Sequence, residues 1–149
     1  MKKQDIPPNY FYLALILTAL LRYLFPQFNI ITYPFNLSGF IVVALGMLIT
    51  YVSWKAFINR GTSESYRKGS TCMVSDGLYA YSRNPMYIGM ILTVIGLWIC
   101  MMMNLLALTG PVFLFIVLNF RFIPYEESVM SRQFGEEFTT YMKRVRRWL

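Results

Sequence analysis

The fold is decided by the stretch Asn84-Pro-Met-Tyr-Ile-Gly-Met-Ile-Leu-Thr-Val-Ile-Gly-Leu-Trp-Ile-Cys-Met-Met-Met-Asn-Leu-Leu-Ala-Leu-Thr-Gly-Pro-Val-Phe-Leu-Phe-Ile-Val-Leu-Asn-Phe120. Its 37 residues carry no charge. A helix needs about 20 apolar residues to cross a bilayer core. The stretch is too long for one span and suits two, at about 85–103 and 105–121. We place the turn near Asn104, which leaves two helices of similar length; Gly110-Pro111 is the alternative turn, and otherwise Pro111 kinks the fourth helix.

Two more charge-free runs lie upstream, Ile6–Leu21 and Tyr23–Trp54. They predict spans at about 9–28 and 37–57, separated by a loop that contains Pro26 and Pro34. The composition agrees, since 56% of residues are hydrophobic and 14% are charged, against about 25% charged in soluble proteins. The sequence predicts an all-α integral membrane protein, one domain over residues 1–149, with four transmembrane helices in two hairpins.

The net charge of +7 is unevenly placed along the chain. Every charge except Arg22 lies at the N-terminus, from Lys55 through a loop at 58–84, or from Arg121 through a tail at 122–149. In a four-span bundle these segments lie on one side, which the positive-inside rule makes cytoplasmic, with both termini inside. This placement favours contact with membrane lipids and no nucleic acid. We expect the inner membrane of a bacterial or archaeal cell, with the active site facing the cytoplasm and Arg22 reaching the outer interface.

The chain has no histidine and only two cysteines, Cys72 and Cys100. The predicted topology places these cysteines at opposite ends of the third span, so we expect no disulfide. Neither cysteine has a neighbour that typically binds metal, and we expect no metal site.

The loop before the third span contains Gly77-Leu-Tyr-Ala-Tyr-Ser-Arg-Asn-Pro-Met-Tyr-Ile-Gly89. Asp76-Gly77 predicts a turn, and Pro85 suits the first position of a helix, capped by Asn84 or Ser82. Arg83 and the tyrosines would then gather at a helix N-terminus that offers N–H donors. Alternatively, Arg83 is a topology anchor and the tyrosines form an interfacial belt.

The tail opens with Arg121 and, shortly after it, the adjacent pair Glu126 and Glu127. Two carboxylates beside a membrane indicate either a functional pair or a solvated helix start. An apolar stripe at helical spacing then follows: Met130, Phe134, Phe138, Tyr141, Val145 and Trp148. The stripe predicts an amphipathic C-terminal helix, which lies in the membrane interface as an anchor or roofs a pocket.

These segments resemble the integral-membrane methyltransferases grouped with isoprenylcysteine carboxyl methyltransferase and the phospholipid N-methyltransferases. The matching pieces, which cover about half the chain, are Gly77-x-Tyr79, Ser82-Arg-Asn-Pro-Met-Tyr-x-Gly89, Arg121 to Glu126-Glu127, Phe134-Gly-x-x-Phe-x-x-Tyr141 and Val145-Arg-Arg-Trp-Leu149. Upstream, Arg60-Gly61-Thr62 resembles a loop of bacterial members.

The resemblance implies S-adenosylmethionine as methyl donor, converted to S-adenosylhomocysteine, in a cytoplasmic pocket. The residues it implies for cofactor binding are Gly77, Tyr79, Arg83, Asn84, Pro85, Tyr87, Gly89, Arg121, Glu126, Glu127 and Tyr141. It implies catalytic roles for Arg83, Asn84 and Tyr87. The chemistry is consistent, because a glutamate can hold the cofactor's ammonium, an arginine its carboxylate and tyrosine faces its sulfonium.

One departure bears on the methyl acceptor: many carboxyl methyltransferases have Arg-His-Pro where this chain has Arg83-Asn84-Pro85. The acceptor therefore stays open between carboxylate, amine and thiol, and the short chain favours a small lipophilic or lipid-like molecule. The alternatives are a phospholipid (ethanolamine) N-methyltransferase, an NADPH-dependent membrane reductase and a non-catalytic membrane adaptor. Which of Glu126 and Glu127 contacts the cofactor is also open.

Overall fold

The computed structural model describes residues 6–61 and 72–149, and within these ranges it contains helices and no strand. The α-helices are α1 (Pro7–Leu24), α2 (Ser38–Asn59), α3 (Pro85–Cys100), α4 (Thr109–Val117) and α5 (Ile123–Arg144). The short turns are η1 (Pro26–Phe28), η2 (Phe35–Leu37), η4 (Gly77–Ala80), η5 (Leu106–Leu108) and the π-helical η6 (Leu118–Phe122). Outside the described residues lie Lys2, Lys3, Asp5, Thr62, Glu64, Arg67 and Lys68.

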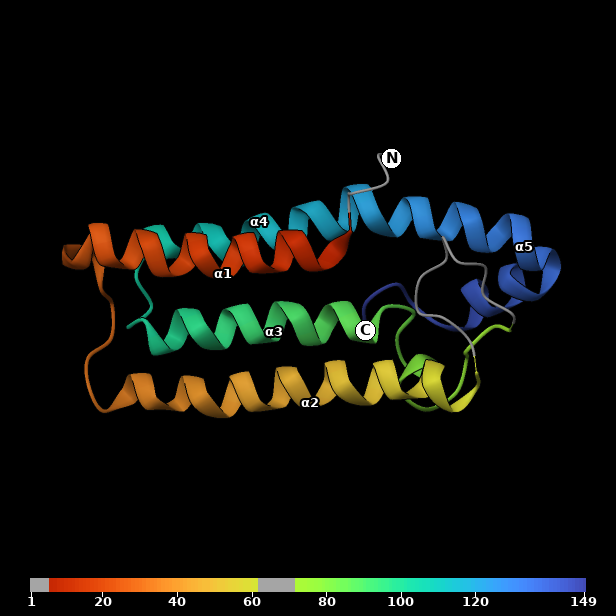
Figure 1. The fold of residues 1–149 in the computed structure, drawn as a ribbon, viewed down its shortest axis with the longest axis horizontal. Helices are drawn as coiled ribbons and strands as arrows, with labels where there is room; N and C mark the ends of the chain where they lie inside the picture. Colours follow the sequence, from red (N-terminus) through yellow and green to blue (C-terminus); the bar gives the residue numbers. More distant parts are fainter. Residues whose placement is uncertain (1–5, 62–71) are drawn as a thin grey trace.

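The helices α1, α2, α3 and α4 lie side by side along the long axis (Figure 1). In this view α1 runs beside α4, α2 runs beside α3, and α5 extends beyond the others at one end. The loop before α3 and the C-terminus lie at the same end as α5. The predicted all-α fold is confirmed, with helices in the four predicted places.

Helices α2 and α3 pack with their backbones in close contact, because glycines line the seam between them. A Cβ added to Gly39 would lie 2.5 Å from the carbonyl oxygen of Gly96, and one added to Gly89 would lie 2.7 Å from that of Gly46. Small residues at such positions let helices approach closely. The seam holds the C-terminal end of α2 against the N-terminal end of α3, where the site described below is formed.

The hairpin between α3 and α4 turns at Asn104, which is fully buried. Its Oδ1 accepts hydrogen bonds from the backbone N–H groups of Leu106 and Ala107 at 3.2 and 3.1 Å. Its Nδ2 donates to the carbonyl oxygen of Phe25 at 2.8 Å. The predicted turn at Asn104 is therefore confirmed, whereas Pro111 lies in the first turn of α4, where a missing N–H costs little.

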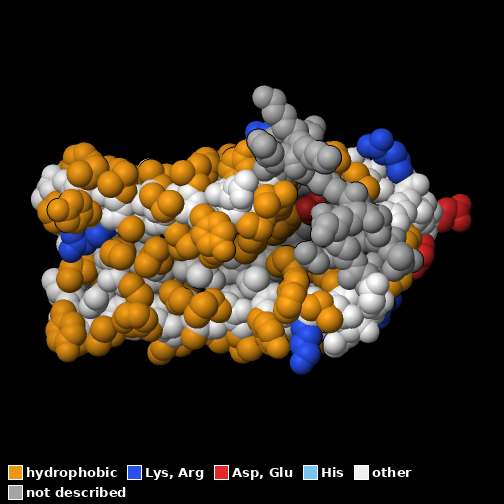
Figure 2. Space-filling model, viewed as in Figure 1, with side chains coloured by type: hydrophobic (Ala, Val, Ile, Leu, Met, Phe, Trp, Pro, Cys, Tyr) orange, Lys and Arg blue, Asp and Glu red, His pale blue; other side chains and the backbone are white. Residues whose placement is uncertain are grey.

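Two helical stretches are long and apolar enough to cross a membrane, Phe35–Asn59 and Leu106–Arg144, while α3 is apolar but shorter. Only 11% of the apolar window in Phe35–Asn59 is buried, unlike the core helix of a soluble protein. Apolar side chains cover the four-helix part of the surface in Figure 2, and acidic groups gather toward the α5 end. Exposed apolar surfaces of this size mark contact with another protein or with a membrane, and the long apolar helices favour the membrane. The number of crossings and the side of the termini stay predictions.

No helix end marks the predicted span boundary near Arg121, because the helix that begins at Leu106 continues past it as far as Gly135. Pro124 cannot donate a backbone hydrogen bond and its ring would crowd the preceding turn. The π-helical η6 precedes it, and the Ile123 N–H bonds to the carbonyl oxygen of Leu118, five residues back, which widens the helix locally. The continuous helix carries Glu126 and Glu127 away from the apolar part of the bundle.

The break comes instead at Gly135, whose φ of 52° and ψ of −119° are not helical. This conformation suits glycine, which has no Cβ. It lets the second half of α5 fold back over the end of the bundle (Figure 1). The tail residues Met130, Phe138, Tyr141 and Val145 are buried against the protein, so this part of the stripe forms a roof, one of the two predicted roles.

Candidate functional site

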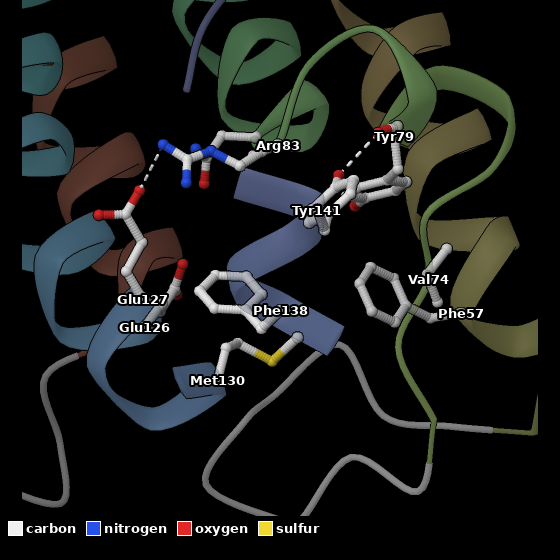
Figure 3. A pocket seen from close by; sticks show the side chains of 10 residues that line it. Phe57, Val74, Tyr79, Arg83, Glu126, Glu127, Met130, Phe138 and Tyr141 are labelled. Atoms are coloured by element: carbon white, nitrogen blue, oxygen red, sulfur yellow. Dashed lines mark hydrogen bonds and ion pairs between the residues drawn. The ribbon is translucent and has the colours of Figure 1, made fainter. Parts of the chain in front are cut away.

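A cavity lies where α2, the loop before α3 and both halves of α5 meet (Figure 3). Its lining residues are Phe57, Val74, Tyr79, Arg83, Asn84, Glu126, Glu127, Met130, Phe138 and Tyr141. A second lobe adds Met86 and Tyr87 from the first turn of α3. Each lobe encloses about 30 Å³, space for little more than water. A larger ligand therefore requires the lining side chains to move apart.

Glu127 is held by two guanidinium groups. Arg147 donates from Nη2 to Oε2 at 2.6 Å and from Nε to Oε1 at 3.2 Å, which is a bidentate pairing. Arg83 Nη2 lies 3.0 Å from Oε1 of the same carboxylate. The Arg83 side chain is 13% exposed and that of Glu127 is 20% exposed. Charge-assisted bonds in such partly dry surroundings are stronger than ordinary ones, so this cluster fixes both arginines.

The C-terminal segment, residues 145–149, is bonded to the loop before α3. The Arg83 backbone N–H donates to the Arg146 carbonyl oxygen at 2.9 Å. The Arg147 carbonyl oxygen accepts from the Ser82 hydroxyl at 3.3 Å and from Asn84 Nδ2 at 2.9 Å. Asn84 therefore precedes α3 as predicted, but its side chain binds the C-terminal segment and makes no cap hydrogen bond.

Glu126 points toward the cavity beside Phe138 in Figure 3. Its Oε1 accepts a hydrogen bond from the hydroxyl of Tyr87. It lies in α5, which carries seven charged residues and continues beyond the apolar part of the helix. Burial raises the pKa of the Glu126 carboxyl to about 7, the Tyr87 hydrogen bond opposes the rise, and the neighbouring Glu127 charge adds to it. Within residues 6–61 and 72–149 Glu126 forms no ion pair with a lysine or arginine, and a bound cation would stabilise its ionised form.

Aromatic rings form much of the remaining wall. The Tyr141 hydroxyl donates to the carbonyl oxygen of Tyr79 at 2.6 Å, and burial raises the pKa of Tyr141 to about 12. The rings of Phe57 and Tyr79 meet edge to face with centroids 5.3 Å apart. Ring faces attract cations, so this wall suits a positively charged, partly apolar group.

The structure brings together seven of the predicted site residues and separates four. Around the two lobes lie Tyr79, Arg83, Asn84, Tyr87, Glu126, Glu127 and Tyr141. Outside them lie Gly77, Pro85, Gly89 and Arg121.

Those four residues have other positions. Gly77 adopts a φ of 57° in the predicted turn, Pro85 begins α3, and Gly89 packs against α2. Arg121 lies over the ring of Tyr10 in α1, with its guanidinium carbon 5.7 Å from the ring centroid. The continuous helix aims Arg121 at α1 and away from the cavity.

Sequence reasoning did not identify Phe57, Val74 or Arg147 as site residues. Phe57 and Val74 are ordinary apolar residues, and no pattern distinguishes them from packing residues. Arg147 belongs to the Val145-Arg-Arg-Trp-Leu149 motif quoted above, but only the folded-back tail brings it to Glu127. Met130 and Phe138 carried a signal, since both belong to the apolar stripe.

The donor set fits the amino-acid part of S-adenosylmethionine. Arg83 Nε is buried without a hydrogen-bond partner, and a buried unpaired donor calls for an acceptor. Glu126 is a half-buried acceptor that lines the same cavity, and aromatic rings form part of the cavity wall. Within residues 6–61 and 72–149 there is no group of three or more His, Cys, Asp or Glu that could hold a metal ion. Cys72 and Cys100 are both free.

Comparisons with known proteins identify methyltransferases among the relatives of this chain. A protein-S-isoprenylcysteine O-methyltransferase of Schizosaccharomyces pombe is 30% identical over 132 residues, which cover 81% of this chain and 52% of that protein. An uncharacterized protein of Haemophilus influenzae is 34% identical over 64 residues, which cover 43% of this chain and all of that protein. The chain thus spans about half the length of the S. pombe relative.

No solved structure gives a significant match. The family model of phospholipid methyltransferases matches residues 35–137. This match includes α2, the loop before α3, the α3–α4 hairpin and both glutamates of the cavity, which is well over half of the chain. The chain belongs to the phospholipid methyltransferase family.

Proposed function

We propose that this protein is an S-adenosylmethionine-dependent methyltransferase that acts on a lipophilic or lipid-like acceptor. One observation carries the proposal: the buried, unpaired Nε of Arg83 and the half-buried carboxyl of Glu126 lie around one cavity with aromatic walls. The amino-acid part of S-adenosylmethionine carries a carboxylate, an ammonium and a neighbouring cationic sulfur. These groups are bound by a cation, an anion and ring faces respectively.

In this assignment Arg83 binds the cofactor's carboxylate and Glu126 its ammonium. Glu127 is a poorer ligand for the ammonium, because two guanidinium groups already hold its oxygens. The rings of Tyr79 and Tyr141 face the sulfonium, and Asn84 and Tyr87 shape the acceptor side of the site. When bound, the cofactor supplies a methyl group on a cationic sulfur, and the residues align and dry the site for transfer.

The acceptor side is the lobe lined by Met86 and Tyr87, between α2 and the first turn of α3. These helices have exposed apolar surfaces, which supports an acceptor that arrives from the bilayer. The names of the family and of the S. pombe relative also support a lipid-linked acceptor. A phospholipid amine and a prenylated carboxylate both fit this description, so both belong in an acceptor screen.

The proposed topology has four spans, α1 to α4, with α5 and both termini on the cytoplasmic side of an inner membrane. The basic residues of the described chain support it, because Arg83, Arg132, Lys143, Arg144 and Arg147 all belong to the α5 end while Arg22 lies in the last turn of α1. Positive residues concentrate on the cytoplasmic side of membrane proteins.

Binding of S-adenosylhomocysteine to the detergent-purified protein, measured by calorimetry with NADPH as the comparison ligand, tests the function. We expect binding of S-adenosylhomocysteine and none of NADPH. Arg83→Ala and Glu126→Gln should each abolish binding or weaken it roughly tenfold or more, as for loss of a charge-assisted bond.

Arg146→Ala and Glu137→Gln are matched controls, since both side chains are exposed. Both variants should bind S-adenosylhomocysteine with the affinity of the wild type. A folded wild-type protein that binds NADPH alone would indicate a reductase, and one that binds neither ligand would indicate a membrane adaptor.

A further inference from the structure

We infer that Arg147 is a positioning residue: by occupying Glu127 it keeps the guanidinium of Arg83 available to an anionic group in the cavity. The inference rests on the proposed function, and it adds a role for the C-terminal segment. Arg147 is itself 35% exposed in its side chain and is absent from the cavity lining. It therefore acts through its neighbours.

The geometry of the shared carboxylate carries the first step. Glu127 presents two oxygens, and Arg147 takes both of them, Oε2 at 2.6 Å and Oε1 at 3.2 Å. Arg83 reaches only Oε1, through Nη2 at 3.0 Å. A guanidinium facing a free carboxylate prefers the bidentate arrangement, with two parallel N–H···O bonds. Without Arg147, both oxygens of Glu127 would be free to accept hydrogen bonds from two donors of Arg83. The Nε of Arg83 would then turn away from the cavity.

The charge of the cluster gives the second step. Two guanidinium groups and one carboxylate sum to one net positive charge. If Arg147 is removed, Arg83 and Glu127 form a pair with no net charge. A partly buried site with one positive charge attracts a carboxylate, whereas a neutral pair does not. Arg147 therefore neutralises Glu127, which would otherwise cancel the positive charge of Arg83.

The backbone of the C-terminal segment gives the third step, because it holds Arg147 in place independently of its own side chain. The Arg147 carbonyl oxygen accepts bonds from Ser82 and Asn84. On the far side, Trp148 Nε1 donates to Asn119 Oδ1 at 3.0 Å, in the π-helical η6. The segment thus joins the loop before α3 to the continuous α4–α5 helix. A substitution at Arg147 removes the guanidinium while these bonds keep the segment docked.

The test compares two ligands that differ only in the amino-acid part. S-adenosylhomocysteine carries a carboxylate and an ammonium, and 5′-methylthioadenosine shares its thionucleoside but carries neither. We expect Arg147→Ala to weaken S-adenosylhomocysteine roughly tenfold and to leave 5′-methylthioadenosine unchanged. Arg147→Lys keeps the charge but loses the planar fork, and it should give an intermediate affinity.

Arg146→Ala is the matched control. Arg146 is the residue before Arg147, its side chain is exposed, and its bond to Arg83 comes from its backbone oxygen, which the substitution keeps. It should change neither affinity. Equal weakening of both ligands by Arg147→Ala would overturn the inference, since it would mean that the segment only supports the fold. Unchanged affinity for both would overturn it as well. If Arg147→Ala does not fold, Arg147→Lys decides between the same outcomes.

The wild-type protein separates this inference from the proposed function. Wild-type binding of S-adenosylhomocysteine with no selective loss in the Arg147 variants refutes the role of Arg147 alone. No binding by a folded wild-type protein refutes the proposed function, and the inference with it.

Discussion

The hydroxyl of Tyr87, in the first turn of α3, donates a hydrogen bond to Oε1 of Glu126, in the first turn of α5. The bond joins the two segments that carry the polar residues of the site. Because burial raises the pKa of Glu126 to about 7, this carboxyl changes its charge within the physiological range. Its neighbour Glu127 instead lies between two arginines.

Cofactor affinity should therefore depend on pH through Glu126. A bound ammonium favours the ionised carboxylate, so binding must remove the proton that Glu126 holds below a pH of about 7. We expect affinity for S-adenosylhomocysteine to rise as the pH rises through this value. Calorimetry at several pH values, in buffers of different ionisation enthalpy, measures both the affinity and the released proton. A Glu126→Gln protein that keeps the same pH profile would contradict the assignment.

The same carboxyl should shape the stability of the ligand-free protein. The folded pKa of about 7 lies above the ordinary value of 4.5, so the fold favours the protonated form. The stability contributed by Glu126 is complete below 4.5, is lost as the pH rises through 7, and stays lost above it. The melting temperature of Glu126→Gln should thus exceed that of the wild type by a margin that grows from pH 4.5 to 7 and is constant above 7. Glu137→Gln, in an exposed position of α5, should show no such trend.

Glu127→Gln should destabilise the fold at neutral pH, in contrast to Glu126→Gln. The change removes the anion between Arg83 and Arg147 and leaves two guanidinium groups in partly buried positions. Loss of the charged partner costs about 1–3 kcal/mol. Thermal unfolding in detergent measures it, and a melting temperature equal to that of the wild type would show that the cluster contributes nothing to stability.

Gly89→Ala should weaken the packing of α2 on α3. The added Cβ would lie 2.7 Å from the carbonyl oxygen of Gly46 and closer still to the hydroxyl of Thr50, so the helices must separate. Overpacking of this kind typically costs about 1–3 kcal/mol. Thermal unfolding checks the loss, and Leu45→Ala, at a half-exposed position of α2, should have little effect. If Gly89→Ala kept its stability but lost binding of S-adenosylhomocysteine, Gly89 would be a binding residue, as the sequence predicts.

Gly135→Ala should strain the reversal in α5. Its φ of 52° and ψ of −119° lie where a side chain typically costs about 1–3 kcal/mol. Since Phe138 and Tyr141 follow the reversal and line the cavity, ligand affinity should fall together with stability. Glu136→Ala, at the next and exposed position, should change neither. Both can be followed by thermal unfolding with and without S-adenosylhomocysteine.

Several features of the fold were predictable from local sequence alone. The charge-free run from Asn84 to Phe120 requires two helices, because it is nearly twice the length of one span. Asn104 marks the turn because its side chain can satisfy the N–H groups that open the next helix. The grouping of Arg83, Asn84 and the glutamates at one end follows from their positions just outside the apolar helices.

The tertiary structure decided the roles within that group. Glu126 and Glu127 are adjacent in sequence and both line the cavity, but successive residues of a helix point about 100° apart, so Glu126 meets Tyr87 and Glu127 meets the two arginines. Arg121 was expected in the site, but the uninterrupted helix turns it toward Tyr10. Arg147 reaches Glu127 only because the chain reverses at Gly135 and returns to α3. Composition and periodicity determine which segments become helices, whereas the pairing of charges depends on where distant segments meet in space.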